Sequence, residues 1–266
     1  MKTIIKGKPL DKCIGPAFYS VHNDIKNHVH TYYDLTGGRG SLKSSFISIE
    51  LIHNMVKPEN SKKHAAVYRR VGDTLETSVY AQIEWAIDML GMSHLWKMTK
   101  SPMRAEYLPT GQKIIFKGLD KAQKSKSIKV PFGYIAYLWF EEFDEFAGEE
   151  EIRKVQQSVI RGGNDFLVFK SMNPPKSRRN WANDFIEKEK LRKDTLVSQT
   201  TYLTSVMRGE AKDQFDLDAS LSERTRAASE LAKRLDVRAK TLNIEGVVNI
   251  IDNIPEDVEI IDEDDN

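Results

Sequence analysis

The stretch GGRGSLKSS, residues 37–45, constrains the fold more than any other part of the chain. It matches the phosphate-loop pattern G-x-x-x-x-G-K-[ST] except that Leu42 stands where the second glycine is usual. The preceding residues, HTYYDLTGG, are typical of a strand that runs into a turn, and SSFISIELIHNMV follows with apolar residues at helical spacing. A loop between a strand and a helix can present backbone N–H groups to an anion. The sequence therefore suggests a nucleotide site, with a basic turn that binds nothing as the alternative.

Strand and helix patterns alternate after this loop. We predict strands in KHAAVYRRV, FGYIAYLWFEEF and DFLVFKSMNPP, helices in TLETSVYAQIEWAIDMLGM and GEEEIRKVQQSVIRG, and a hairpin in RAEYLPTGQKIIFKGL that turns at Thr110-Gly111. The run FGYIAYLWFEEF is apolar on both faces, which is typical of a central strand covered on both sides. The alternation predicts an α/β fold with a mainly parallel central sheet flanked by helices.

Composition limits the class of protein. No apolar run approaches the roughly 20 residues that cross a bilayer, and the N-terminus lacks the apolar core of a secretory signal. Cys13 is the single cysteine, which excludes an internal disulfide and fits a reducing cytoplasm. Residues 205–266 carry 8 Lys+Arg and 16 Asp+Glu, a net charge of −8, whereas residues 1–204 carry a net charge of +9. A basic body suggests contact with a polyanion, and an ordinary solvated surface is the alternative.

The residues of the loop suggest different roles in binding a nucleotide. Gly37, Gly38 and Gly40 can adopt unusual backbone angles, and Ser41 and Leu42 complete the turn. Lys43 is placed for the β- and γ-phosphates, and the hydroxyl of Ser44 for Mg²⁺. A side chain at residue 42 is tolerable if it points away from the phosphates.

Two acids follow the most apolar strand directly. We expect Glu141 to hold the metal and Glu142 to act as the catalytic base, because ligands bind at the carboxyl ends of strands in open α/β sheets. Most acidic pairs are surface charge, which is the alternative here. The strand in FKSMNPP ends at the same predicted edge, where Ser171 and Asn173 could sense the γ-phosphate or the attacking water.

These segments resemble the ATPase domain of the large terminase subunits of tailed bacteriophages. The resemblance is carried by HTYYDLTGGRGSLKSSFISIE, YIAYLWFEEFDEF and VFKSMNPP, and it covers roughly residues 10–204. In that family a residue other than glycine often precedes the loop lysine, as Leu42 does here. The resemblance implies a P-loop NTPase fold of the ASCE type, with ATP and Mg²⁺ as cofactors. It also implies that ATP hydrolysis drives double-stranded DNA into a procapsid.

The resemblance implies roles and partners too. Arg39 in the loop would contact the γ-phosphate and stabilise the transferring charge, and the segment with Ser171 and Asn173 would couple hydrolysis to movement. The expected partners are double-stranded DNA, the terminase small subunit, the portal protein and further copies in a ring, in the cytoplasm of the host cell and without a membrane. A neighbouring subunit could supply another arginine, for which the candidates are Arg69, Arg70, Arg104, Arg178 and Arg179. A salt bridge or a contact with the DNA backbone is the favoured alternative for each of them.

The chain departs from the family after residue 204. About 60 residues follow, too few for the family's nuclease domain, so we expect no DNA cleavage by this chain. Residues 205–266 form a second predicted unit, helical and acidic, which resembles the C-terminal part of terminase small subunits. A generic amphipathic helix packed on the ATPase is the alternative. A non-catalytic module that binds DNA or a terminase partner, with an idle ATPase fold, is the alternative function.

Overall fold

The computed structural model describes residues 5–38, 40–119, 128–175, 177, 179–200 and 248–251. The strands are β1 (Ile5–Pro9), β2 (Tyr32–Gly37), β3 (Lys63–Arg69), β4 (Trp96–Lys100), β5 (Met103–Tyr107), β6 (Gln112–Gly118), β7 (Tyr134–Glu141), β8 (Leu167–Met172), β9 (Thr195–Thr200) and β10 (Val248–Ile251). The helices are α1 (Tyr19–Lys26), α2 (Lys43–Met55), α3 (Ala81–Met89), α4 (Glu149–Val159) and α5 (Trp181–Glu189). No helix among these residues is long and apolar enough to cross a bilayer.

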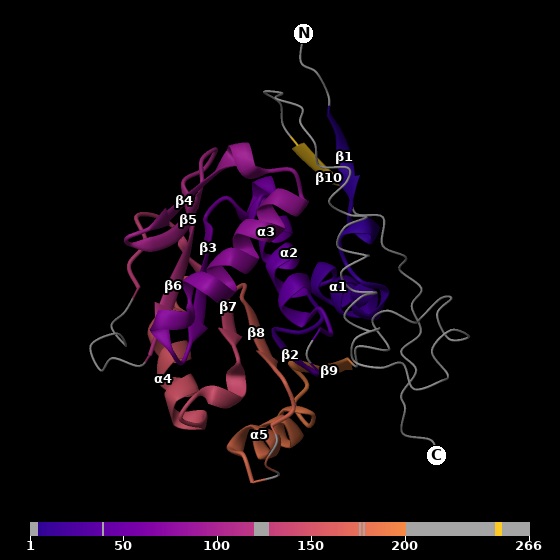
Figure 1. Cartoon of the computed structure of the whole chain (residues 1–266), viewed down its shortest axis with the longest axis vertical. Coiled ribbons are helices and arrows are strands. Elements are labelled where there is room, and N and C mark those ends of the chain that lie inside the picture. Colours follow the sequence, from indigo (N-terminus) through magenta and orange to yellow (C-terminus); the bar gives the residue numbers. More distant parts are fainter. Residues whose placement is uncertain are drawn as a thin grey trace.

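The central sheet has eight strands in the order β4-β5-β6-β3-β7-β8-β2-β9 (Figure 1). All neighbouring strands from β6 to β9 run parallel, and β5 pairs antiparallel with both β4 and β6. The hairpin predicted at Thr110-Gly111 is therefore confirmed as β5–β6. The mainly parallel α/β fold expected from the alternation of elements is confirmed as well.

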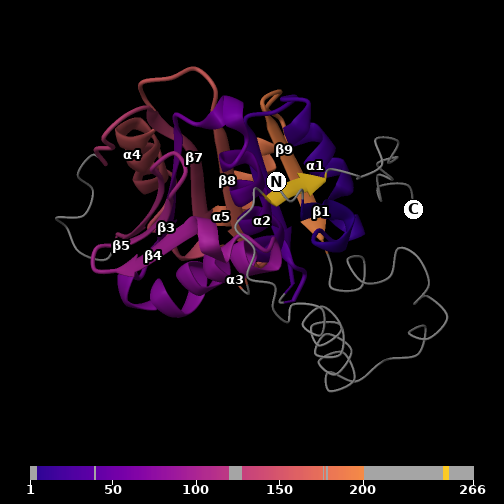
Figure 2. The same ribbon diagram turned by 90° about the horizontal axis from the view of Figure 1, so that it is seen from above.

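Helices cover both faces of the sheet (Figures 1 and 2). One hydrophobic core joins α1, α2 and α3 to one face, and a second joins α4 and α5 to the other. Successive residues of β7 alternate between them, because Tyr137 and Trp139 lie in the first core while Leu138 and Phe140 lie in the second. This alternation confirms that the apolar run in β7 is a central strand buried on both faces.

The helix predicted in residues 74–92 consists of two parts. A π-helical turn, Glu76–Tyr80, leads into α3, and the chain then reaches Gly91 at φ +72°. A left-handed glycine is a common end for a helix because it has no Cβ to clash. π-Helical turns are rare and occur frequently at functional sites.

The first and last described segments pair with each other. β1 and β10 form a separate two-stranded parallel sheet, with Ile5 opposite Val248 and Pro9 opposite Ile251. Residues 248–251, within the segment expected to be helical and acidic, form a strand. The other residues from 201 to 266, including the predicted helix in SLSERTRAASELAKRL, lie outside the described part of the chain.

Candidate functional site

Three strands of the sheet end around one pocket of about 400 Å³. β8 lies between β2 and β7, so the loop after β2 faces the ends of the other two strands. The register places Thr36 beside Met172 and Glu141 beside Ser171, which brings distant sequence segments to one edge. The pocket is lined by Gly40, Ser41, Leu42, Lys43, Ser44, Ser45, Glu141, Glu142, Ser171, Met172 and Asn173.

The backbone of the loop explains two of its glycines and its leucine. A Cβ on Gly37 would collide with the backbone oxygen of Thr200 on β9, so only glycine fits there. Gly40 has φ +76°, and Leu42 has φ +64°, in the left-handed region that favours glycine. Leu42 thus adopts the strained conformation for which glycine is usual, with 38% of its surface exposed. Gly38 is different, because a Cβ there would meet nothing within 4 Å.

Lys43 begins α2 and turns back into the loop. Its Nζ donates to the carbonyl oxygens of Gly37 at 2.7 Å and Gly38 at 3.1 Å, and to Oγ of Ser41 at 2.8 Å. The residue is buried. Burial lowers the pKa of Lys43 from 10.5 to about 8, although the charge of Glu141 acts in the opposite direction. The amine is therefore a buried cation held by oxygens of its own loop.

The end of β8 is linked to both neighbouring strands. Nζ of Lys43 lies 3.3 Å from Oδ1 of Asn173, which accepts its hydrogen bond. The hydroxyl of Ser171 accepts a hydrogen bond of 2.9 Å from Nε1 of Trp139 on β7. Ser171 and Asn173 therefore join the phosphate-type loop to the strand that carries the acids.

Arg69, the last residue of β3, contacts both acids that follow β7. Its Nε lies 2.8 Å from Oε2 of Glu141, and its Nη2 forms an ion pair with Glu142. The Nε and Oε2 atoms are close but not aligned for a hydrogen bond, and neither has another partner among the described residues. Arg69 is only 6% exposed. Arg69 therefore forms ion pairs within its own chain, which is the alternative to a role in a neighbouring subunit.

The environment of the two acids differs. Burial raises the pKa of Glu141, and the charge of Arg69 lowers it in part. The side chain of Glu141 is 14% exposed and that of Glu142 is 35% exposed. Glu142 has φ +53°, a left-handed conformation that turns the chain sharply after β7. Glu141 is thus the more enclosed of the two acids and interacts with the charge of Lys43, whereas Glu142 is the more exposed.

A second hollow of about 310 Å³ adjoins the first and shares Ser44 and Glu141 with it. Its remaining lining comes from the π-helical turn and α3: Thr77, Ser78, Val79, Ala81, Gln82 and Trp85. Sequence reasoning does not single out these residues, because their pattern is that of one regular helix. The sequence does place Arg69 at the basic end of a strand, but its position beside Glu141 and Glu142 depends on the pairing of β3 with β7.

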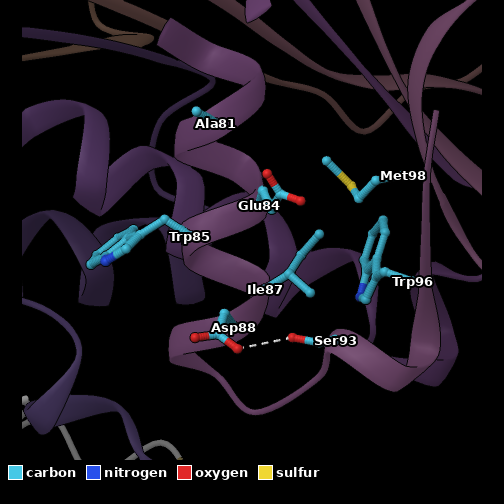
Figure 3. Close-up of a pocket in the computed structure, with 8 residues that line it drawn as sticks. All are labelled: Ala81, Glu84, Trp85, Ile87, Asp88, Ser93, Trp96 and Met98. Atoms are coloured by element: carbon cyan, nitrogen blue, oxygen red, sulfur yellow. Dashed lines mark hydrogen bonds between the residues drawn. The ribbon is translucent and has the colours of Figure 1, made fainter. Parts of the chain in front are cut away.

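The largest of these hollows, about 650 Å³, lies between α3 and β4 (Figure 3). Trp85, Trp96, Met98 and the acids Glu84 and Asp88 line it, and Asp88 accepts a hydrogen bond of 3.1 Å from Ser93. The described residues that line it include no lysine or arginine, so their chemistry does not suit a phosphate. The smaller pocket at the loop combines a lysine, hydroxyls and two carboxylates, which are suitable groups for a metal-bound polyphosphate.

Among the described residues, Arg70, Arg104 and Arg179 do not line this pocket. Arg70 lies 3.7 Å from Glu151, Arg104 lies 3.9 Å from Glu106 on β5, and Arg179 is exposed before α5. Arg39 and Arg178 lie outside the described residues.

Comparisons with known proteins show which family this chain matches. Residues 27–210 match the family described as phage terminase large subunit. The large terminase subunit of Bacillus phage SPP1 is 42% identical over 192 residues, which are 71% of this chain and 45% of that protein. This chain therefore spans less than half the length of that relative.

Solved structures show the same fold. The large terminase of bacteriophage HK97 aligns with 84% of this chain and 47% of its own, with a TM-score of 0.54 at 11% identity. The large terminase of a thermophilic bacteriophage, solved in complex with ADP, aligns with 80% of this chain and 48% of its own, with a TM-score of 0.56 at 12% identity. The fold is that of the terminase ATPase domains, an ASCE-type P-loop fold. On the match to residues 27–210, this chain belongs to the family of phage terminase large subunits.

Proposed function

We propose that the described sheet and its loop form the ATP-hydrolysing part of a phage DNA-packaging motor. The observation that carries the proposal is the convergence of Lys43, Ser44, Glu141 and Glu142 on one pocket at the ends of β2 and β7, the two neighbours of β8. Reactions of phosphoryl groups depend mainly on positioning and on stabilisation of charge, and this pocket offers groups for both. The family relationship and the ADP bound to a protein of the same fold support the choice of nucleotide.

Each pocket residue has a role in the proposal. Residues 37–42 cradle the phosphates through the backbone, and Lys43 pairs with the β- and γ-phosphates. Ser44 and Glu141 would hold Mg²⁺, which would neutralise part of the phosphate charge. Glu142 accepts the proton of the attacking water, and Arg39 in the loop stabilises charge on the γ-phosphate.

Coupling to DNA movement would begin at Asn173. Nζ of Lys43 donates a hydrogen bond of 3.3 Å to Oδ1 of Asn173. Phosphate oxygens would compete for the same amine, so nucleotide binding would release Asn173 and the end of β8. Ser171, bonded to Trp139, would pass a change at β8 to the strand that bears the acids.

The proposed partners are those of the family's motor. Double-stranded DNA suits the net charge of +9 on residues 1–204. We further propose a homo-oligomeric ring, with the portal protein and the terminase small subunit as partners, in the cytoplasm of the host cell. Arg70, Arg104, Arg178 and Arg179 remain the candidates for an arginine that reaches a neighbouring subunit.

We propose that residues 1–204 form the ATPase unit and that residues 205–266 form a distinct segment related to small subunits. The switch in charge from +9 to −8 supports this division. The pairing of β10 with β1 means that the second segment also contacts the start of the first.

The decisive experiment measures Mg²⁺-dependent ATP hydrolysis with and without double-stranded DNA. We expect turnover that DNA stimulates, and we expect Lys43→Ala to abolish both nucleotide binding and turnover. Glu142→Gln should bind a fluorescent ATP analogue normally yet hydrolyse ATP at least about 100-fold more slowly, which is the usual size of a lost general base.

Matched controls come from α4, outside the pocket. Lys154→Ala and Glu150→Gln remove the same side-chain types at positions that are 67% and 58% exposed, and both should leave turnover unchanged. Hydrolysis by Glu142→Gln at the parental rate would refute its role as the base. Nucleotide binding without any turnover, with or without DNA, would favour a non-catalytic assembly module.

A further inference from the structure

A second group of metal-ligating side chains lies outside the proposed nucleotide site. His22 on α1 faces Glu50 and His53 on α2, and one ligand atom from each lies within 4.8 Å of the other two. Glu50 and His53 are three residues apart, so they share one face of the helix. Two helices therefore bring two imidazoles and a carboxylate to one point.

The group is buried and already compact. The side chains of His22, Glu50 and His53 are 0%, 1% and 6% exposed. Nδ1 of His22 lies 2.8 Å from Oε2 of Glu50, and Nδ1 of His53 lies 3.9 Å from Oε1 of the same carboxylate. The rings of His22 and His53 lie 5.7 Å apart at 29°, so both present their edges to the same carboxylate region. Small shifts in side-chain angle would bring these atoms to the distances of about 2 Å that zinc requires.

A hydrogen-bonded pair explains only part of this arrangement. It accounts for His22 and Glu50, but Nδ1 of His53 is buried without a hydrogen-bond partner among the described residues. A buried polar atom in this state has lost its hydrogen bonds to water without replacement, which is unfavourable. An ion between the three residues would take this nitrogen as a ligand and remove that cost.

We propose that His22, Glu50 and His53 bind a divalent transition-metal ion, with Zn²⁺ as the best fit. Neutral imidazole and carboxylate are typical zinc ligands, whereas Mg²⁺ prefers oxygen alone. The two oxygens of Glu50 bring the number of donor atoms to four. Nδ2 of Asn54 donates to Oε1 of Glu50 at 2.6 Å and thereby fixes the carboxylate from outside, as partners of metal ligands commonly do.

The position of the site suggests what the ion does. α2 begins at Lys43, so Glu50 and His53 lie on the second and third turns of the helix that follows the phosphate-type loop. An ion shared with His22 would tie this helix to α1. Its role would be structural, since the nucleotide pocket lies at the other end of α2 and contains none of the three residues.

The test is zinc binding by the full chain. The protein is stripped with a chelator and titrated with Zn²⁺ against a chromophoric chelator, and metal per chain is measured by mass spectrometry. We expect one Zn²⁺ per chain, a thermal midpoint that rises with Zn²⁺, and a loss of affinity of more than about 100-fold in His53→Gln, which exceeds the usual effect of losing an outer partner. Co²⁺ in place of Zn²⁺ should give the visible absorption of a four-coordinate ion.

Two variants separate this site from other metal binding. His28→Gln removes a histidine that is 62% exposed, and Glu141→Gln removes the acid proposed for Mg²⁺, so both should keep the Zn²⁺. If His53→Gln does not fold, X-ray absorption of the zinc-loaded parent replaces it and should show two imidazoles with oxygen. Substoichiometric Zn²⁺ in the parent, unchanged affinity in His53→Gln, or a six-oxygen shell would overturn the proposal.

Discussion

Nε of Arg69 lies 2.8 Å from Oε2 of Glu141, and the same guanidinium forms an ion pair with Glu142. These residues come from the ends of β3 and β7, which are neighbouring parallel strands. One buried cation therefore lies against both carboxylates for which we propose roles in metal binding and base catalysis, and it balances only one of their two negative charges. Arg69 and a metal ion would act on the same acids, so each should affect the other.

Replacing Arg69 by methionine should make folding depend on Mg²⁺. The change leaves Glu141 buried without its cation, and loss of one partner of a buried pair typically costs about 3–5 kcal/mol. Mg²⁺ would supply the missing charge, so it should recover more of the free energy of unfolding in Arg69→Met than in the parent. Urea unfolding with and without Mg²⁺ measures both values. Arg153→Met, at a side chain that is 60% exposed, should change stability by less than about 0.5 kcal/mol and serves as the control. A variant as stable as the parent, or one indifferent to Mg²⁺, would contradict this account.

Leu42 should be less favourable than glycine in its present conformation. Its φ of +64° brings the Cβ of an L-residue close to its own backbone, at a cost of roughly 1–2 kcal/mol. Glycine avoids that cost but gains freedom in the unfolded chain, which offsets part of it. We expect Leu42→Gly to be more stable than Leu42→Ala by roughly 0.5–1 kcal/mol in denaturant unfolding. The alanine variant keeps the Cβ, so equal stability of the two would show that the backbone is not strained there.

The titration of Lys43 should appear in stability at alkaline pH. Burial lowers its pKa from 10.5 to about 8, so between these values the unfolded chain binds a proton that the folded chain does not. The free energy of unfolding therefore rises with pH across this window, and below pH 8 the contribution is constant. Relative to Lys43→Met, the parent should gain up to about 3 kcal/mol from pH 8 to pH 10.5. Denaturant unfolding of the parent and of Lys43→Met at each pH gives the difference in their free energies of unfolding. The titration of other groups at alkaline pH is common to both proteins and cancels in this difference. A constant difference would mean that Lys43 titrates normally.

Lys170 should contribute strongly to stability although it lies in an apolar strand. Its Nζ lies 2.7 Å from Oδ1 of Asp34 on β2 and 2.9 Å from Oε2 of Glu189 on α5, and its side chain is 2% exposed. Lys170→Met leaves the buried carboxylate of Asp34 without its ion-pair partner and Glu189 with Arg192 alone, 3.4 Å away, so we expect a loss of about 3–5 kcal/mol in urea unfolding. Lys188→Met is the matched control, since that side chain is 65% exposed and pairs with Glu149 at the surface. A loss below about 1 kcal/mol for Lys170→Met would mean that other groups stabilise the charges of Asp34 and Glu189 in its absence.

The order of elements was predictable because each has a distinct hydrophobic period. The strand before the loop, the helix after it and the central strand with Tyr137 to Phe140 all occur where periodicity placed them. β4 and β9 were not predicted. Trp96–Lys100 is a short, partly exposed strand at one edge of the sheet, and Thr195–Thr200 is a polar strand at the other, so neither has a strong apolar pattern.

The members of the pocket were predictable, but their contacts were not. Strand ends of a parallel sheet meet at one edge, which brings Lys43, Glu141 and Ser171 together from their sequence context alone. The ion pairs of Arg69 and Lys170 depend on which strands are neighbours. Sequence order does not reveal that β3 lies beside β7 or that β8 lies beside β2. The cluster of His22, Glu50 and His53 depends in the same way on the packing of α1 against α2.

The pairing of β1 with β10 has a practical consequence for dividing this protein. A truncation at residue 204 follows the change in charge, yet it would remove Val248–Ile251 and leave the backbone groups of Ile5–Pro9 without the strand that satisfies them. An unpaired strand edge invites association with another chain. A protein truncated there would therefore expose an unpaired strand edge near its N-terminus. Any self-association of that protein would result from the truncation and not from assembly of the motor.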